Sequence, residues 1–348
     1  MATIKEVAER CGVSISTVSR VVNAPEMVSP EKRRLVEQAI KELGYTPNAL
    51  ARGLISKQTD TVGVLMPDIS NPYAAEVVKG IEDAGHALGI HVILCNTDAR
   101  SERTIRNLDV LRQKRVDGII FMSKAISEEF YQIFRKMKIP VVLAATESLV
   151  YELPSIKIND EQASYDAAKY LVSRGHTRIG MISGPIGDSI AGLPRFKGFK
   201  RACRELLGME DVGSRVEFSS FHFQSGCEAM GRLYERHPEL TAVFCASDEI
   251  ALGAVSLLHD LGIAVPDTVS VMGFDNTKIS WMSIPKLTTV AQPMYEIGRT
   301  AMHTLDKLRA GKPLEQLRTY LPHEIIERES VRDLSKIHLA APLLPKQS

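Results

Sequence analysis

The 348-residue chain has little of what marks an exported, membrane-bound or metal-dependent protein. It has no apolar run long enough to span a bilayer, and its N-terminus is a charged segment without the pattern of an export signal. Its five cysteines show no C-x-x-C spacing, and Cys11, Cys95 and Cys245 lie in apolar patterns typical of reduced core thiols. We therefore expect a cytoplasmic protein that needs no membrane, metal or cofactor.

The chain also lacks catalytic signatures and a strong net charge. None of the patterns H-E-x-x-H, G-x-S-x-G or G-x-x-x-x-G-K-[ST] occurs, and the nine histidines show no metal-ligand spacing. We therefore do not expect an enzyme. The formal net charge is only +1, so any binding to nucleic acid depends on specific contacts and dimerisation rather than on a broad positive surface.

Residues 3–23, TIKEVAERCGVSISTVSRVVN, predict two short helices joined by a tight turn. Thr3 and Glu6 have the T-x-x-E spacing of a capping box. Gly12 suits a left-handed helix end, and Ser14 can cap the second helix. The face that remains outward on the second helix carries short hydrogen-bonding groups around one arginine, namely Ile15, Ser16, Thr17, Ser19, Arg20 and Asn23. Such a face suits a DNA major groove, although the pattern alone also fits an ordinary helical pair.

A third helix and a short linker follow. Ser29 and Pro30 predict a capped helix start, and Gly44 predicts its end. The expected core positions of this helix are Leu35, Val36, Ala39, Ile40 and Leu43. The apolar segment 46–60 predicts a hinge helix that orders only against a partner and DNA, where Leu54 would wedge between base steps in the minor groove. Leu54 as a simple core residue is the competing interpretation.

From Thr61 the pattern changes to short buried strands separated by amphipathic helices. The apolar runs lie at 61–67, 91–97, 117–123, 140–146, 178–184, 241–247, 269–275 and 287–292. This alternation predicts parallel sheets, and its length predicts two doubly wound subdomains rather than one open sheet. Ligands of such sheets bind beyond the carboxyl ends of the strands.

These motifs resemble the LacI/GalR family of bacterial transcription regulators. The headpiece pattern T-[IL]-x-[DE]-V-A-x-x-x-G-V-S-x-x-T-V-S-R-V-[LV]-N is met at every fixed position from Thr3 to Asn23. The resemblance continues through LGY-x-P-N-x-x-A-R-x-L at 43–54, SDEIALG, VSVMGFDN and PKLTTV, and it covers residues 3–332.

The resemblance implies an α helix-turn-helix headpiece followed by an α/β periplasmic-binding-protein-like core of two doubly wound parallel-sheet subdomains. The implied parts are the headpiece (1–45), a hinge helix and linker (46–60), an effector-binding and dimerisation core (61–335) and a flexible tail (336–348). The two subdomains of the core would span approximately 61–159 plus 291–320, and 160–290 plus 321–335.

The implied function is a homodimer that binds palindromic operators and acts mainly as a repressor of carbohydrate or catabolite genes. Ile15, Ser16 and Arg20 would face base edges, and Arg20 suits a guanine. The residues implied at phosphates are Thr3, Ser14, Thr17, Ser19 and Asn23, and those at the minor groove are Asn48, Ala51 and Leu54. A surface salt bridge from Arg20 to Glu6 or Glu9 is the competing interpretation. Tetramers of the family use a C-terminal leucine heptad helix, which the proline-bearing tail cannot form, so a dimer is favoured.

In the core, the resemblance places an effector site at Arg195, Phe221, Ser247 and Asp275. One arginine and one aspartate could hold hydroxyls or a phosphate, which favours a small sugar or sugar phosphate. The competing interpretation is that Arg195 and Asp275 only pair across the cleft and hold the subdomains together. A periplasmic-type solute-binding protein is the alternative of another class, and the attached headpiece argues against it.

A corepressor protein is the other candidate effector. The body is most similar to the catabolite-control subgroup, which binds the serine-phosphorylated phosphocarrier protein HPr. The implied surface comprises Asp68, Asp83, Glu296, Arg299, His303 and Lys307. His303 stands where the subgroup's phosphate-binding arginine is expected, and a neutral imidazole is a poor phosphate ligand. Arg299, one turn earlier, is the candidate substitute, and both effector types stay open.

Overall fold

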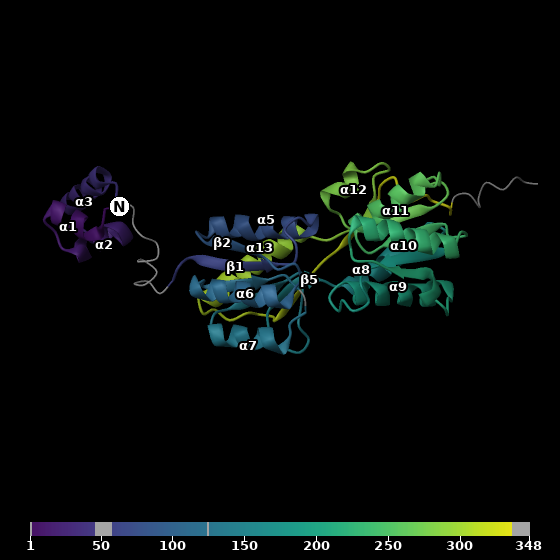
Figure 1. Cartoon of the computed structure of the whole chain (residues 1–348), viewed down its shortest axis with the longest axis horizontal. Helices are drawn as coiled ribbons and strands as arrows, with labels where there is room; N and C mark the ends of the chain where they lie inside the picture. The colour runs from purple at the N-terminus through teal and green to yellow at the C-terminus, as the bar shows by residue number, and fades with distance from the viewer. Residues whose placement is uncertain (1, 46–57, 124, 336–348) are drawn as a thin grey trace, which may run out of the picture. The chain divides into compact units, whose positions relative to one another are not determined.

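The computed structural model describes residues 2–45, 58–123 and 125–335, and the chain divides into two compact units, Met1–Asp60 and Thr61–Ser348 (Figure 1). The predicted hinge residues Asn48, Ala51 and Leu54 and the predicted tail 336–348 lie outside the described residues. None of the helices in the described ranges has the length and apolar character that crossing a membrane requires.

The first unit contains three helices around a small core. They are α1 (Ile4–Cys11), α2 (Ile15–Asn23) and α3 (Pro30–Leu43), with a short 3-10 turn η1 (Pro25–Met27) before α3. Val7, Val18 and Val36, one from each helix, are fully buried. The capping box is confirmed, because the Glu6 amide donates to Thr3 Oγ1 (3.3 Å) and the Thr3 amide donates to Glu6 Oε2 (2.8 Å).

Two expectations for α3 are wrong. Ser29 occupies the N-cap position, but its side chain makes no capping hydrogen bond. Leu35 and Leu43 were expected in the core and are 46% and 36% exposed. The reason is geometric, since a unit of three short helices covers only a narrow stripe of α3, and Val36 and Ala39 fill that stripe.

The second unit is built on two sheets. Within the described residues, the first sheet has the order β11-β5-β4-β3-β1-β2, and the second has the order β12-β10-β9-β8-β6-β7. The strands of the first sheet, all paired in parallel, are β1 (Thr61–Met66), β2 (His91–Asn96), β3 (Gly118–Phe121), β4 (Val141–Ala144), β5 (Ser155–Ile158) and β11 (Arg318–Leu321). The strands of the second are β6 (Ile179–Ser183), β7 (Val216–Phe218), β8 (Ala242–Cys245), β9 (Ser270–Asp275), β10 (Thr288–Ala291) and β12 (Glu324–Ile326). β12 pairs antiparallel to β10 and departs from the expected all-parallel pattern.

Each of the eight predicted apolar runs contains a strand, whereas β5, β7, β11 and β12 were not predicted. These four are only three or four residues long and carry charged or polar side chains, so they give no continuous apolar signal. In β5 the charged residue is Lys157, which is buried because acidic neighbours neutralise it.

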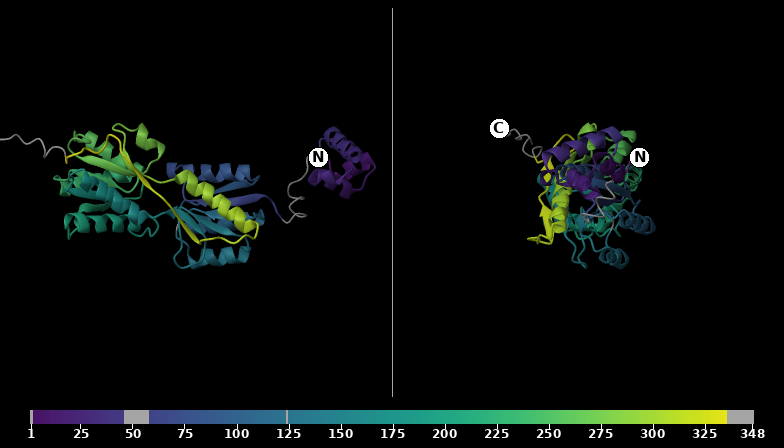
Figure 2. Two further views of the ribbon diagram at one scale, coloured as in Figure 1. Left: turned by 180° about the vertical axis from the view of Figure 1, so that it is seen from behind. Right: turned by 90° about the vertical axis from the view of Figure 1, so that its left-hand side faces the viewer.

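Helices cover both faces of each sheet (Figures 1 and 2). Their bounds are α5 (Pro72–Ala87), α6 (Ser101–Gln113), α7 (Glu128–Met137), α8 (Asp160–Ser173), α9 (Gly192–Leu207), η2 (Gly213–Arg215), α10 (Phe223–Arg236), α11 (Asp248–Asp260), α12 (Lys278–Met282) and α13 (Met294–Arg309). Strand alternation determines the layers: Val62 and Val64 of β1 pack with the α5 and α13 side, whereas Leu65 packs with the α6 and α7 side.

α5 and α13 lie side by side with their backbones in contact. A Cβ added at Gly80 would collide with the Tyr295 carbonyl, and one added at Gly298 would collide with the Val77 carbonyl. Only glycine permits this approach. It holds a helix from the end of the chain against the start of the first sheet (Figure 2).

The chain passes between the two sheets three times. It leaves the first sheet after β5, returns to it after β10, and reaches the second sheet again after β11. The parallel strands of a sheet end at one edge, so the loops that follow them gather there. In this unit those loops enclose a cavity.

Candidate DNA-reading surface and effector cavity

The exposed face of α2 carries the residues expected at base edges. Ile15 is 49% exposed, although it is a large aliphatic residue, and Ser16 and Arg20 are exposed beside it. Among the described residues, Arg20 makes no ion pair: Glu6 is engaged in the capping box and Glu9 pairs with Lys5 (3.8 Å). The alternative salt bridge is therefore not formed, and the guanidinium remains available to a ligand.

The start of α2 is held by a compact hydroxyl cluster. Ser14 caps the helix by accepting from the Thr17 amide (3.2 Å), and its hydroxyl also bonds Ser16 Oγ (2.7 Å) and Thr17 Oγ1 (2.9 Å). Thr3 is exposed at the start of α1, Ser19 is half-buried, and Asn23 ends α2. Arg20 and these hydroxyl groups thus belong to one small unit whose caps set their positions.

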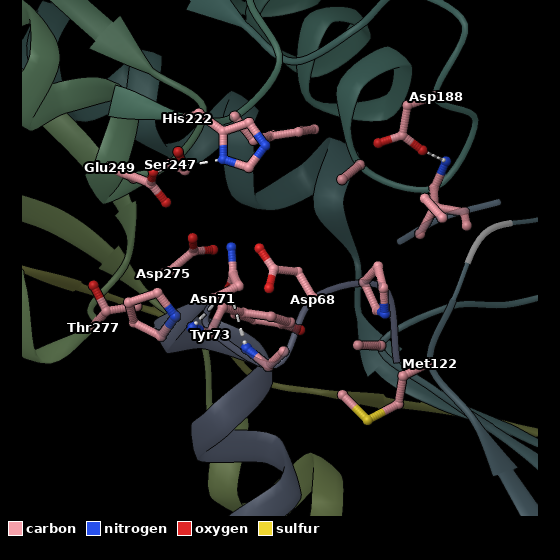
Figure 3. A pocket seen from close by; sticks show the side chains of 18 of the residues that line it. Asp68, Asn71, Tyr73, Met122, Asp188, His222, Ser247, Glu249, Asp275 and Thr277 are labelled. Atoms are coloured by element: carbon pink, nitrogen blue, oxygen red, sulfur yellow. Dashed lines mark hydrogen bonds and ion pairs between the residues drawn. The ribbon is translucent and has the colours of Figure 1, made fainter. Parts of the chain in front are cut away.

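The second unit encloses a cavity of about 540 Å³ between its two subdomains (Figure 3). Asp68, Asn71, Tyr73 and Met122 line it from the first-sheet side, and Asp188, His222, Ser247, Glu249, Asp275 and Thr277 line it from the second-sheet side. All four predicted effector residues, Arg195, Phe221, Ser247 and Asp275, line this cavity.

Backbone strain is concentrated at the cavity. Of the nine non-glycine residues with positive φ in the described ranges, five line it: Asp98, Ala99, Ala145, Phe221 and Asp275. Such conformations each cost of order 1–3 kcal/mol and persist mainly where a functional geometry requires them. The strain therefore supports this cavity as a binding site.

Arg195 is the centre of the cavity's ionic network. Its side chain is buried, Nε donates to Asp160 Oδ1 (2.9 Å), and Nη1 donates to the Ala246 carbonyl (2.6 Å). Nη2 forms an ion pair with the same Asp160 oxygen (2.8 Å). Its guanidinium carbon lies 3.8 Å from the centroid of the Phe274 ring. Asp275 Oδ1 is farther, at 3.7 Å from Nη1.

The competing interpretation, in which Arg195 and Asp275 pair across the cleft, is wrong about the cleft, because the two side chains pair within one subdomain. Arg195 lies on α9 and Asp275 ends β9, so both belong to the second-sheet subdomain. The link to the first subdomain runs instead through Gln292, which donates to Asp275 Oδ1 (2.7 Å) and accepts from the Tyr73 hydroxyl of α5 (3.4 Å).

Two buried aspartates have perturbed acidity. Burial raises the pKa of Asp275, and the nearby positive charge of Arg195 opposes this only in part. Burial also raises the pKa of Asp248, against hydrogen bonds from Thr289 Oγ1 (2.6 Å) and from the amide and hydroxyl of Thr277. Asp248 thus ties α11 to two other segments rather than capping the helix, which Ser247 does by accepting from the Ile250 amide (3.2 Å).

Phe221 lines the cavity with its ring over Gly184. A Cβ at Gly184 would fall within the ring, so glycine is required for this approach. Phe221 is half-buried rather than a closed core residue, and one face of it remains available to a ligand.

Sequence reasoning missed several residues of the cavity. Lys157, Asp160 and Gln292 line it and were not predicted. Lys157 Nζ lies 3.1 Å from Asp160 Oδ2 and 3.2 Å from Glu147 Oε1, so a buried cation joins the Arg195 network. A lysine inside the otherwise apolar SIKI run, followed three residues later by an aspartate, was the available signal. Among the described residues no cluster of His, Cys, Asp or Glu has the geometry to hold a metal ion.

The expected corepressor surface is brought together only in part. On α5 and α13, Asp83 bonds Lys79 and accepts from the Tyr295 hydroxyl (3.2 Å), and Arg299 pairs with Glu296 (2.7 Å). His303, half-buried, and Lys307, exposed, lie farther along α13. Asp68 does not join them, because it lines the cavity and accepts from the amide and hydroxyl of Ser70.

Comparison with known proteins matches each of the two units to a protein-family model. Residues 3–48 match the bacterial regulatory proteins of the lacI family, and residues 59–312 match the periplasmic binding proteins and sugar binding domain of the LacI family. The chain belongs to the LacI family. It is a DNA-binding transcriptional regulator with a helix-turn-helix domain and a periplasmic-binding-protein-like domain.

Relatives of this LacI-family regulator match it over nearly their whole length. It is 42% identical to catabolite control protein A of Priestia megaterium over 330 residues, which is 95% of this chain and 99% of that protein. It resembles the structure of the transcriptional regulator CelR in complex with cellobiose (31% identity, TM-score 0.73, 95% of this chain and 100% of that one). It also resembles the Lac repressor dimer bound to operator and the anti-inducer ONPF (26% identity, TM-score 0.84, 95% of this chain and 99% of that one).

Proposed function

We propose that this regulator is a homodimeric repressor that reads a palindromic operator through α2 and is controlled by a small ligand in the cavity. The observation that carries the proposal is that both subdomains line the cavity (Figure 3). A ligand there contacts both, so it stabilises one relative orientation of the subdomains over another, and this differential binding is what allosteric control requires.

Arg20, Ser16 and Ile15 would read base edges, while Thr3, Ser14, Thr17, Ser19 and Asn23 would position the headpiece on phosphates. The exposure of Ile15 supports this division of roles, as does the guanidinium of Arg20, which pairs with no carboxylate in the described part of the chain. The hinge residues Asn48, Ala51 and Leu54 stay a prediction from the sequence.

The DNA-binding assignment is tested by measuring operator affinity of Arg20→Ala on a palindromic site and on sites with single base changes. We expect weaker binding and relaxed preference at one position of each half-site, at a cost of about 1–3 kcal/mol per half-site. Arg33→Ala is the matched control, because Arg33 is an exposed arginine of the same unit that already pairs with Glu37 (2.7 Å). Equal operator affinity and base preference in both variants would refute the assignment.

For the effector, we propose a sugar in the cavity. The similarity to a regulator solved with cellobiose supports it, as do Arg195, Asp275 and the half-buried Phe221, which offer hydrogen-bonding groups beside an aromatic face. The test is titration of sugars while Trp281 fluorescence and operator affinity are followed. An effect on operator affinity that Phe221→Ala abolishes is the expected result.

Phosphorylated HPr is the second candidate effector, favoured by the 42% identity to a catabolite control protein. The geometry of α13 weighs against it, because Arg299, the candidate phosphate ligand, is already bound by Glu296 through Nε (2.8 Å) and Nη2 (2.7 Å). Titration of phosphorylated HPr against the operator complex separates the two effectors. Enhanced operator binding that Arg299→Ala removes would favour the corepressor.

A further inference from the structure

Among the described residues that line the cavity, acidic side chains outnumber basic ones. Six carboxyl groups line it: Asp68, Asp98, Asp160, Asp188, Glu249 and Asp275. Asp98 pairs with Arg103, and burial raises the pKa of Asp275 to about 8, so the unpaired negative charge lies on Asp68, Asp188 and Glu249. Among the described residues, the lysine and arginine that line the cavity are Lys157 and Arg195, which are buried against Asp160 and Asp275 and therefore already neutralised. His222 also lines the cavity, 3.6 Å from Glu249. Within the described lining, an incoming phosphate would thus meet carboxylates without a free lysine or arginine to compensate its charge.

The helix ends that could bind a phosphate are also occupied. Asp188 accepts from the amides of Ile190 (2.9 Å) and Gly192 (3.1 Å) at the start of α9. Glu249 accepts from the amide of Phe223 (3.0 Å) at the start of α10. Free amides at helix N-termini are the usual phosphate site of such folds, and here the chain's own carboxylates fill that role.

The amides at the start of α5 are also occupied by a side chain of the protein, because Asn71 Oδ1 accepts from the amides of Tyr73 (2.9 Å) and Ala74 (3.2 Å). What these groups still offer the cavity is carboxylate and amide oxygen with spare lone pairs (Figure 3). Hydroxyl groups can donate to such oxygens, whereas phosphate oxygens at neutral pH cannot.

Resting on the proposed effector function, we propose that the cavity selects an uncharged, hydroxyl-rich ligand and rejects its phosphate ester. The ligand's hydroxyls donate to the cavity carboxylates, and its apolar face lies on Phe221. Of the sugar and the sugar phosphate that the sequence left open, the sugar is the effector class that this charge distribution favours.

The test is calorimetric titration of the full-length chain with matched pairs at neutral pH: cellobiose, glucose and ribose against cellobiose 6-phosphate, glucose 6-phosphate and ribose 5-phosphate. We expect at least one free sugar to bind, at least tenfold more tightly than its own phosphate ester, with Phe221→Ala weakening that binding. Raising the salt concentration should reduce the ratio of sugar to phosphate-ester affinity, since salt screens the repulsion between the phosphate and the cavity carboxylates. Tighter binding of a phosphate ester, or no binding by any free sugar, overturns the proposal.

A double variant tests the cause. Asp68→Asn with Glu249→Gln removes two negative charges yet keeps an amide oxygen for each existing donor, because both Ser70 donors meet Asp68 Oδ1 and the Phe223 amide meets Glu249 Oε1. We expect the ratio of sugar to phosphate-ester affinity to fall at least threefold. The control is Asp109→Asn, on α6 and outside the cavity lining, which should leave the ratio unchanged. An unchanged ratio in the double variant would refute the electrostatic origin.

Measuring operator affinity distinguishes a failure of the proposed effector role from a failure of the proposed charge selectivity. If a free sugar binds as predicted without altering operator affinity, the effector role fails and the charge selectivity stands. If a phosphate ester alone alters operator affinity through the cavity, the effector role stands and the charge selectivity fails.

Discussion

Removing the Arg195 side chain should weaken the second unit more than any exposed arginine can. Arg195→Ala deletes the hydrogen bond and the ion pair with Asp160, the hydrogen bond to the Ala246 carbonyl and the contact with the Phe274 ring, all in a buried site. Breaking a buried ion pair costs about 3–5 kcal/mol because a carboxylate remains buried without its partner. Asp160 keeps Lys157 at 3.1 Å, so we expect the low end, about 3 kcal/mol.

For a unit of this size, that loss corresponds to a fall in melting temperature of roughly 6–12 °C. The measurement is thermal unfolding of the full chain by circular dichroism, read at the transition of the second unit. Arg201→Ala is the control on the same helix, since Arg201 is 39% exposed and pairs with Glu161 at 3.0 Å. Such an exposed pair contributes below about 1 kcal/mol.

The pH dependence gives the sharper test. The positive charge of Arg195 lowers the pKa of Asp275 against the larger effect of burial, so removing it raises that pKa further. The native state of the variant then keeps Asp275 protonated at a higher pH than the native wild type, in which the pKa of Asp275 is about 8, and the stability deficit shrinks as the pH falls from about 10 to 7. A deficit that equals that of Arg201→Ala, or that grows as the pH falls, would refute the reasoning.

The remaining predictions concern local packing and capping. Gly298→Ala should destabilise the second unit by about 1–3 kcal/mol, because its Cβ would collide with the backbone of α5. Gly231→Ala should stabilise α10 by about 0.5–1 kcal/mol, because its Cβ would meet only Leu257 at 3.4 Å. Urea unfolding of the two variants measures both changes in the free energy of unfolding. Ser14→Ala should lower the stability of the first unit by about 1 kcal/mol through the lost cap, and Ser29→Ala should cost far less because Ser29 makes no capping bond. Amide hydrogen exchange of residues 3–45 measures both, and equal protection losses would contradict the capping argument.

The sequence alone determined the local structure of the headpiece. The capping box of Thr3 and Glu6, the left-handed Gly12 and the Ser14 cap depend on residues within three or four positions of one another, and all three form as predicted. The eight long apolar runs became strands for a related reason, since a buried parallel strand needs an uninterrupted apolar segment and little else. The family likewise follows from motifs whose order and spacing the chain preserves.

Only the tertiary structure decided how the cavity is charged. Asp160, Arg195 and Asp275 are far apart in the sequence. They pair within one subdomain because the fold brings the first turns of α8 and α9 close to the carboxyl end of β9. Spacing could name Arg195 and Asp275 as ligand groups, but it could not show that Asp160 had already neutralised the arginine. The same limit explains Leu35, whose helical period predicted burial that so small a unit cannot supply. Helix caps and helix ends depend on residues that are neighbours in the sequence, whereas the compensation of a buried charge depends on groups that only the folded chain brings together.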